Sequence, residues 1–410
     1  MWGRLLSAYL ARLIQVGSLE VTFPDGTRRA HGPGGPGPRV ALAITDTGTL
    51  RRLALNPHLE LGEAYTDARL TIEGDDLHGL LELALRNIAA GHDSRLNAAM
   101  WWVRDRFRWI SQRNPATRAR RNVAHHYDLS GGLYDLFLDA DRQYSCAYFK
   151  DPADTLEQAQ AQKKAHIAAK LCLKPGMKVL DIGCGWGGMA LTLARDFGVE
   201  VLGVTLSSEQ LAMARTRAEA AGLAGQVRFD LTDYRAVQGR FDRVVSVGMF
   251  EHVGVPQYLT YFRKVRDLLT ADGVALIHTI GRAAPPGSTN PWIAKYIFPG
   301  GYIPALSETM AAIERSGLVQ TDVEIWRLHY AMTLRHWHDR FMARRDQAAA
   351  LYDERFVRMW KFYLAASEQV FRHAGQCVFQ IQLARDQAAV PLTRDYLHVP
   401  SSAAFPLAGA

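Results

Sequence analysis

A glycine-rich loop is the first part of the sequence whose residue types suggest chemistry. The segment DIGCGWG (181–187) follows a strand-like apolar run and opens a helical one. Glycines at such a turn allow a tight bend and a close approach of the backbone to a ligand. Dinucleotide sites share this pattern, so it predicts a cofactor without identifying it.

Two features argue against a dinucleotide. Trp186 would crowd the position where a pyrophosphate meets the helix N-terminus. The second predicted strand, 199–204, is followed by Thr205 rather than by the acidic residue that usually holds a ribose. Thr205 and Gln210 could replace that acid, although Ser207 and Gln210 also fit a helix capping box. Asp233 and Tyr234, after the third predicted strand, either flank an adenine or form a plain turn.

The segment LDIGCGWG (180–187) resembles the first motif of class I S-adenosylmethionine methyltransferases, whose loop packs against the methionine part of the cofactor. A wider set of segments resembles the cyclopropane-fatty-acid synthase family, over about 122–385. These segments are HHYDLSGGLYDLF (125–137), YSCAYF (144–149), VTLSSEQ (204–210), SVGMFEHVG (246–254), HTIG (278–281), PWIAKYIFPGGYIP (291–304) and HYAMTLRHW (329–337).

The second resemblance implies the reaction. An alkene attacks the sulfonium methyl group of S-adenosylmethionine, and a base removes a proton from the resulting cation as a cyclopropane ring closes. Water would quench that cation, so the pocket must be dry. The resemblance assigns the following residues to the cofactor: Tyr144, Ser145, Asp181, Gly183, Gly185, Gly187, Thr205, Leu206, Gln210, Asp233 and Tyr234.

In this family a bound bicarbonate is thought to be the base, and its cage here would be Cys146, Glu251, His278, the backbone of Ile280, and Tyr330. An anion needs hydrogen-bond donors, which the thiol, imidazole, phenol and main-chain N–H supply. Because the anion would repel Glu251, we expect this carboxylate to hydrogen-bond His278 and fix its tautomer. Each residue also has a structural reading: Cys146 as a small buried hydrophobe, His278 as a core residue and Tyr330 as a helix-start packing residue.

The elements that must position these residues alternate along the chain. Helices over 155–172, 207–221 and 256–269 separate strands over 178–182, 199–204, 227–230, 243–247 and 274–280. This order predicts an α/β fold with a doubly wound, mainly parallel sheet, the Rossmann-like class I methyltransferase scaffold. We expect three parts: a smaller N-terminal α+β domain associated with lipid (1–110), a basic linker (111–124) and the catalytic domain (125–400). The first should hold strands over 18–23 and 40–44 and a helix over 76–90.

The composition and charge indicate which partners and which kinds of site to expect. The net charge is +7, and the stretch from Arg104 to Arg121 has seven arginines and one acid, next to several tryptophans. Basic and indole side chains together favour an anionic membrane surface, and no nucleic-acid motif is present. The sequence lacks a run of about 18 apolar residues, and its four scattered cysteines lack metal-site spacing, so we expect no spanning helix, no metal and reduced thiols.

Family members that act on intact phospholipids resemble this chain in having an extra N-terminal domain. The resemblance therefore implies an unsaturated phospholipid as substrate, a homodimer, and a cytoplasmic enzyme held peripherally at the inner face of the membrane. Two alternatives stay open. One is a methyltransferase that adds a methyl or methylene branch to a lipid or methylates a different small acceptor, such as an amine. The other is a non-catalytic lipid-binding or regulatory protein with the same fold.

Overall fold

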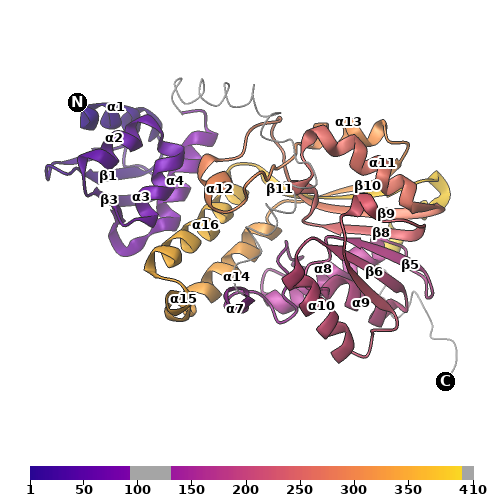
Figure 1. Cartoon of the computed structure of the whole chain (residues 1–410). Coiled ribbons are helices and arrows are strands. Elements are labelled where there is room, and N and C mark those ends of the chain that lie inside the picture. The colour runs from indigo at the N-terminus through magenta and orange to yellow at the C-terminus, as the bar shows by residue number, and fades with distance from the viewer. Residues whose placement is uncertain (93–130, 399–410) are drawn as a thin grey trace.

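The computed structural model describes residues 1–92 and 131–398. A smaller N-terminal unit and a larger unit built on a wide sheet are joined through α14 (His329–Ala343) and α16 (Glu354–His373), which lie between them (Figure 1). Within the described ranges, no helix combines the length and apolar character that a membrane span requires. The predicted linker and the basic stretch over 104–121 lie outside the described residues, as does the start of the segment at 125–137.

The N-terminal unit packs four helices around a small mixed sheet of order β2-β1-β3-β4, in which β1 and β3 run parallel. Its elements are α1 (Trp2–Leu13), β1 (Ser18–Thr22), β2 (Arg28–His31), β3 (Arg39–Ile44), α2 (Thr47–Leu55), α3 (Pro57–Thr66), β4 (Leu70–Ile72), η1 (Glu73–Asp75) and α4 (Leu77–Ala89). The predicted strands and helix of this unit are present within a residue or two. Asp76 begins α4 because its side chain accepts a hydrogen bond from the Gly79 N–H.

The larger unit contains a seven-stranded sheet of order β10-β11-β9-β8-β5-β6-β7. The strands from β9 to β7 in that order are parallel, and β11 is antiparallel to both of its neighbours. They are β5 (Lys178–Ile182), β6 (Glu200–Thr205), β7 (Val227–Leu231), β8 (Phe241–Val247), β9 (Leu269–Arg282), β10 (Val319–Trp326) and β11 (Gln376–Ala384). Near-continuous apolar runs form the central strands, as expected where both faces are covered.

Helices cover both faces of this sheet. α8 (Leu156–Lys170), α9 (Gly188–Phe197) and α10 (Ser208–Ala220) lie on one side, and α11 (Tyr258–Leu268) and α13 (Leu306–Glu314) lie on the other (Figure 1). The remaining elements are α7 (Gly131–Asp135), η2 (Tyr234–Ala236), η3 (Phe250–His252), η4 (Val255–Gln257), α12 (Pro291–Tyr296), α15 (Arg345–Leu351), η5 (Gln387–Ala389) and η6 (Asp395–Leu397). The doubly wound, mainly parallel fold is thus confirmed. The start of α14 agrees with the helix start expected at Tyr330, whereas β10, β11, α15 and α16 were not predicted.

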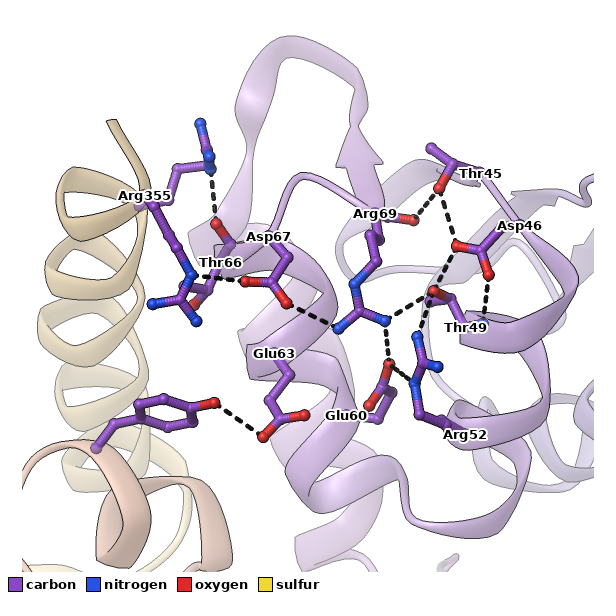
Figure 2. Close-up of polar contacts among 12 residues, drawn as sticks. Thr45, Asp46, Thr49, Arg52, Glu60, Glu63, Thr66, Asp67, Arg69 and Arg355 are labelled. Atoms are coloured by element: carbon purple, nitrogen blue, oxygen red, sulfur yellow. Dashed lines mark hydrogen bonds and ion pairs between the residues drawn. The ribbon is translucent and has the colours of Figure 1, made fainter. Parts of the chain in front are cut away.

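The two units are in close contact along α3, α12 and α16. A Cβ atom added to Gly62 of α3 would lie 2.6 Å from the indole of Trp292 in α12, so only glycine permits this approach. Polar contacts border the packing: Arg355 Nε lies 2.8 Å from Asp67 Oδ1, and the Tyr296 hydroxyl donates to Glu63 at 3.0 Å. Figure 2 shows Asp67 between Arg355 of α16 and a guanidinium of the N-terminal unit.

A buried ion network stiffens the N-terminal side of this interface. The Glu60 carboxylate, only 3% exposed, lies 2.8 Å from both Arg52 Nε and Arg69 Nη1 (Figure 2). Arg69 also pairs with Asp67 at 2.9 Å and donates to Thr49 at 2.9 Å. Burial raises the pKa of Glu60, and the hydrogen bond from Arg52 opposes that shift. The network fixes α3 in the orientation that its contacts with the larger unit need.

Candidate active site

The glycine loop joins β5 to α9 at the carboxyl end of the sheet. Gly183, Gly185 and Gly187 all have positive φ angles, a conformation that other residues rarely adopt. A Cβ atom on Gly187 would lie 2.6 Å from the ring of Phe229, and one on Gly183 would lie 2.9 Å from Met249. The loop therefore depends on glycine for both its turns and its packing.

A cavity of about 160 Å³ lies over this loop. It is lined by residues that follow β5, β6, β7 and β8, as expected for a doubly wound sheet. All but one of the residues assigned to the cofactor line it, namely Tyr144, Ser145, Asp181, Gly183, Gly185, Thr205, Leu206, Gln210, Asp233 and Tyr234. Gly187 does not line it; this residue precedes α9 and packs under the loop.

Two expected cofactor contacts have partners within the protein. The Thr205 hydroxyl donates to Gln210 Oε1 at 3.0 Å, so these two side chains form one polar unit at the end of β6. Ser207 also caps α10, because its side chain accepts a hydrogen bond from the Gln210 N–H. The predicted capping box is only half formed, since the Ser207 N–H donates to Thr205 Oγ1 rather than to the Gln210 side chain. Asp233 accepts a bidentate pair of hydrogen bonds from Arg235.

Asp181 is the buried acid of the cavity. Its side chain is 2% exposed, and its Oδ2 atom has no hydrogen-bond partner in the described structure. Burial raises the pKa of Asp181 to about 7. An ionised carboxylate here needs a donor or a positive charge from a ligand, which a cofactor with an ammonium and a sulfonium group would supply. The residues thus fit S-adenosylmethionine.

A second, larger cavity of about 550 Å³ adjoins the first. Tyr144, Ser145, Gly248 and His252 line both cavities and form the wall between them. All five residues assigned to the anion cage line the second cavity: Cys146, Glu251, His278, Ile280 and Tyr330. The structure therefore brings the predicted reaction residues together in one place, next to the predicted cofactor site.

His278 is held by Gln380 rather than by Glu251, so the predicted Glu251–His278 hydrogen bond is wrong. The Gln380 Nε2 atom lies 3.1 Å from His278 Nδ1, and both side chains are buried. The two residues are direct partners in the antiparallel β9–β11 pair, where opposed side chains lie on the same face. With the Gln380 amide donating to Nδ1, the neutral imidazole carries its proton on Nε2. Burial, reinforced by the charge of Lys163, lowers the pKa of His278 and keeps the ring neutral.

Glu251 instead binds the backbone of β9. Its Oε1 atom accepts a hydrogen bond from the Ile280 N–H at 2.7 Å, which uses the donor that the resemblance assigned to the anion. Its Oε2 atom is buried and has no partner in the described structure. Burial raises the pKa of Glu251 to about 7. Glu251 is thus a lining residue of the larger cavity with one buried oxygen that lacks a described partner.

Aromatic residues and a thiol complete the site. Cys146 is 1% exposed, and burial raises the pKa of its thiol, so it stays protonated. The thiol donates to the Ala147 carbonyl oxygen at 3.3 Å. Tyr330 lies in the first turn of α14 and packs its ring against Phe371, with centroids 4.9 Å apart, which confirms its packing role; it also lines the cavity. The Tyr144 hydroxyl lies 2.9 Å from that of Tyr363. Such a surface excludes water and offers ring faces to a cation.

Lys163 is a buried residue that the sequence prediction missed. Its Nζ atom donates to Ser145 Oγ at 2.7 Å and to Gln143 Oε1 at 2.8 Å, and burial lowers its pKa to about 8. It therefore fixes the segment that carries Tyr144 to Cys146. A signal was present, because Lys163 lies four residues from both Ala159 and Ile167 on the apolar face of α8.

Comparisons with known proteins agree with this geometry. Residues 114–381 match the family described as mycolic acid cyclopropane synthetase, and residues 5–94 match a domain of unknown function (DUF7884). The chain is 41% identical over 348 residues to the cyclopropane-fatty-acyl-phospholipid synthase of Escherichia coli (strain K12), covering 84% of this chain and 87% of that protein. It is 37% identical over 376 residues to a probable fatty acid methyltransferase of Pseudomonas putida, covering 89% and 93%.

Solved structures show the same relationship for the larger unit. The cyclopropane synthase MmaA2 from Mycobacterium tuberculosis superposes with a TM-score of 0.62 at 32% identity, covering 66% of this chain and 99% of that one. The mycolic acid cyclopropane synthase CmaA1, solved with SAH and CTAB, gives 0.62 at 33% identity over the same shares, 66% and 99%. Coclaurine N-methyltransferase, at 19% identity, a TM-score of 0.65 and coverage of 79% and 99%, shares the fold.

Proposed function

Because this chain belongs to the mycolic acid cyclopropane synthetase family of S-adenosylmethionine-dependent methyltransferases, we propose that it closes a cyclopropane ring on an unsaturated acyl chain of a phospholipid. The observation that carries the proposal is the pair of adjoining cavities. One is small, partly polar and lies over the glycine loop; the other is larger, mainly apolar and holds His278, Cys146 and Tyr330. A one-carbon donor and a long apolar acceptor need such a pair.

The wall between the cavities determines where transfer takes place. S-adenosylmethionine supplies a methyl group to the alkene, and the alkylated chain then loses a proton as the ring closes. Tyr144 and Ser145 line both cavities, so they border the path of the methyl group. Lys163 holds Ser145, and Tyr363 holds Tyr144, which keeps this border in place. The apolar walls keep out water, which would otherwise add to the cation.

We propose that bicarbonate is the proton acceptor. The residues suit a small oxyanion, because His278, with a proton on Nε2, and Tyr330, with its hydroxyl, line one cavity. Cys146 lines the same cavity, and its thiol would have to turn from the Ala147 carbonyl to donate to the anion. The unmatched Oε2 atom of Glu251 distinguishes among anions, because bicarbonate is an anion that still has an O–H to donate. The Glu251 carboxylate would repel a fully deprotonated anion, but it can accept a hydrogen bond from the O–H of bicarbonate. His278 and Glu251 would orient the anion from two sides.

We further propose that the acyl chain belongs to a phospholipid and that the protein acts at a membrane surface. Support for the phospholipid and the membrane surface comes from the N-terminal unit, which lies outside the family match over residues 114–381, and from the basic, Trp-rich sequence over 101–121. Peripheral binding to an anionic membrane and a homodimer are predictions that rest on sequence and family resemblance.

The test is a direct assay. Vesicles of cis-monounsaturated phosphatidylglycerol are incubated with the protein and S-adenosylmethionine, and the acyl chains are analysed by mass spectrometry and proton NMR. The proposal expects loss of vinyl protons with the appearance of cyclopropane ring protons. A methyl or methylene branch, or methylation of an added amine with no change in the lipid, would refute it. Removing carbon dioxide and bicarbonate from the buffer should lower the rate, and adding bicarbonate back should restore it; an unchanged rate would refute the assigned base alone.

A further inference from the structure

The larger cavity does not end in the catalytic unit. Its lining continues from His278 and Tyr330, past Trp292 and Phe362 at the interface, into the interior of the N-terminal unit. There the walls come from α1, β1, β3 and α4, with lining residues that include Leu10, Ile14, Val21, Leu42, Leu80 and Ala84. The core of the N-terminal unit is therefore open on the side that faces the reaction site.

The lining of the cavity becomes less polar along this path. Among the lining residues between Leu6 and Ile88 there is no Asp, Glu, Lys or Arg. The N-terminal unit contributes only two side chains with polar groups to the lining, Tyr9 and His58. Arg282, Asn290 and Gln376, which also line the cavity beyond the reaction site, come from the larger unit. A charged glycerophosphate group could not enter the N-terminal part without a large desolvation cost, whereas a hydrocarbon could.

A cavity of this kind is not a usual feature of a protein interior. Interiors are close-packed, and an empty apolar cavity costs stability in proportion to its volume. Such cavities stay dry and take apolar ligands. The volume of about 550 Å³ lies in the range of cavities that hold small-molecule ligands.

We infer that the interior of the N-terminal unit holds the methyl-terminal segment of the acyl chain, beyond the double bond that reacts. This inference rests on the proposed function and extends it, because it makes the N-terminal unit part of the substrate site. The polar head group then lies toward the Arg282 side of the cavity. The N-terminal unit would then select substrates by the length of the acyl chain beyond the double bond.

The experiment compares two chains in one vesicle. Mixed vesicles contain phosphatidylglycerol with myristoleoyl chains and with oleoyl chains, which share the position of the double bond and differ only in the methylene groups beyond it. The ratio of the two cyclopropane products, measured by mass spectrometry, gives the ratio of kcat/KM and does not depend on how much enzyme is folded. The test variant is Ala84→Phe, which fills the N-terminal part of the cavity. The matched control is Ala89→Phe, which adds the same ring to an exposed position of α4.

The inference expects Ala84→Phe to lower the ratio of oleoyl to myristoleoyl product by about tenfold or more, because a filled pocket rejects added methylenes. The control should keep the wild-type ratio. Ile88→Phe makes the same test with less added volume at a partly exposed lining position, should the first variant not fold. An unchanged ratio in both lining variants, or an equal change in the control, would overturn the inference. If the wild-type protein alkylates neither chain, the proposed function itself fails.

Discussion

Replacing Gln380 by leucine should separate the fold of the active site from its chemistry. The side chain of Gln380 is fully buried and makes one described hydrogen bond, to His278 Nδ1 at 3.1 Å. Leucine has a similar volume, so the strand pair β9–β11 should persist. The ring of His278 would then have a buried nitrogen without a partner, and nothing would keep its proton on Nε2.

The size of the effect follows from that hydrogen bond. Leaving a buried polar group without its partner costs about 1–3 kcal/mol. If that free energy is what holds His278 in its productive tautomer, kcat should fall about 5- to 150-fold. Gln380→Glu should lower kcat further, because a carboxylate would draw the ring proton to Nδ1 and leave Nε2 as an acceptor. S-adenosylmethionine affinity should stay close to that of the wild type in both variants.

The assay measures kcat on unsaturated vesicles, cofactor affinity by calorimetry and the thermal midpoint. Gln382→Leu is the matched control: Gln382 lies two residues along β11, is equally buried, and donates to the Lys170 carbonyl and the Tyr396 hydroxyl, away from the cavity. It should lower stability with little change in kcat per folded molecule. A wild-type kcat for Gln380→Leu, or an equal fall in the control, would refute the assigned role.

Three further predictions follow from the same structure. Asp181→Asn should weaken S-adenosylmethionine binding about 10- to 150-fold, measured by calorimetry, because a hydrogen bond to a charged group is lost. The pKa of Asp181 is about 7, so the affinity of the wild-type protein for S-adenosylmethionine should rise as pH rises through 7. The affinity of the variant should not change with pH in this range. Glu251→Gln should lower kcat about 10- to 150-fold with unchanged cofactor affinity, and should abolish the rise in wild-type turnover as Glu251 ionises near pH 7. Gly62→Leu should separate the two units, because the new side chain collides with Trp292. The expected results are faster proteolysis between the units and loss of activity on vesicles. The control Gly225→Leu adds its side chain in open space and should change neither.

The parallel sheet and the cofactor loop could be predicted from the sequence because their signals are local. Apolar runs of strand length precede the glycine loop, Thr205 and Asp233, and each run ends where a side chain is needed. Cys146, His278 and Tyr330, which come from separate motif segments, line one cavity. Strands β10 (VQTDVEIW) and β11 (QCVFQIQLA) were not predicted; polar side chains interrupt the apolar ones in both, so neither reads as the continuous apolar run of a central strand.

What could not be predicted depends on pairing between distant segments. Gln380 meets His278 only because β11 lies antiparallel to β9 in one particular register, and a shift of one residue would turn the amide to the other face. Without that knowledge, the nearest carboxylate in the motif, Glu251, was the natural partner for the imidazole. The open core of the N-terminal unit was equally hidden, since its leucines have the same pattern whether they pack on one another or line a cavity.

Two buried carboxyl groups connect these findings to the chemistry. Asp181 lies in β5 and Glu251 follows the neighbouring strand β8. Each has an oxygen without a described partner, and burial raises the pKa of each to about 7. In a folded chain without ligands they bind more protons between about pH 4 and 7 than in the unfolded chain, so they lower stability as pH rises through that window. A positively charged ligand at Asp181 and an O–H donor at Glu251 would stabilise the ionised carboxylates and so remove this loss of stability. Under the proposed function, the two unmatched oxygens therefore gain partners only when S-adenosylmethionine and bicarbonate are both bound, so we expect turnover to require both.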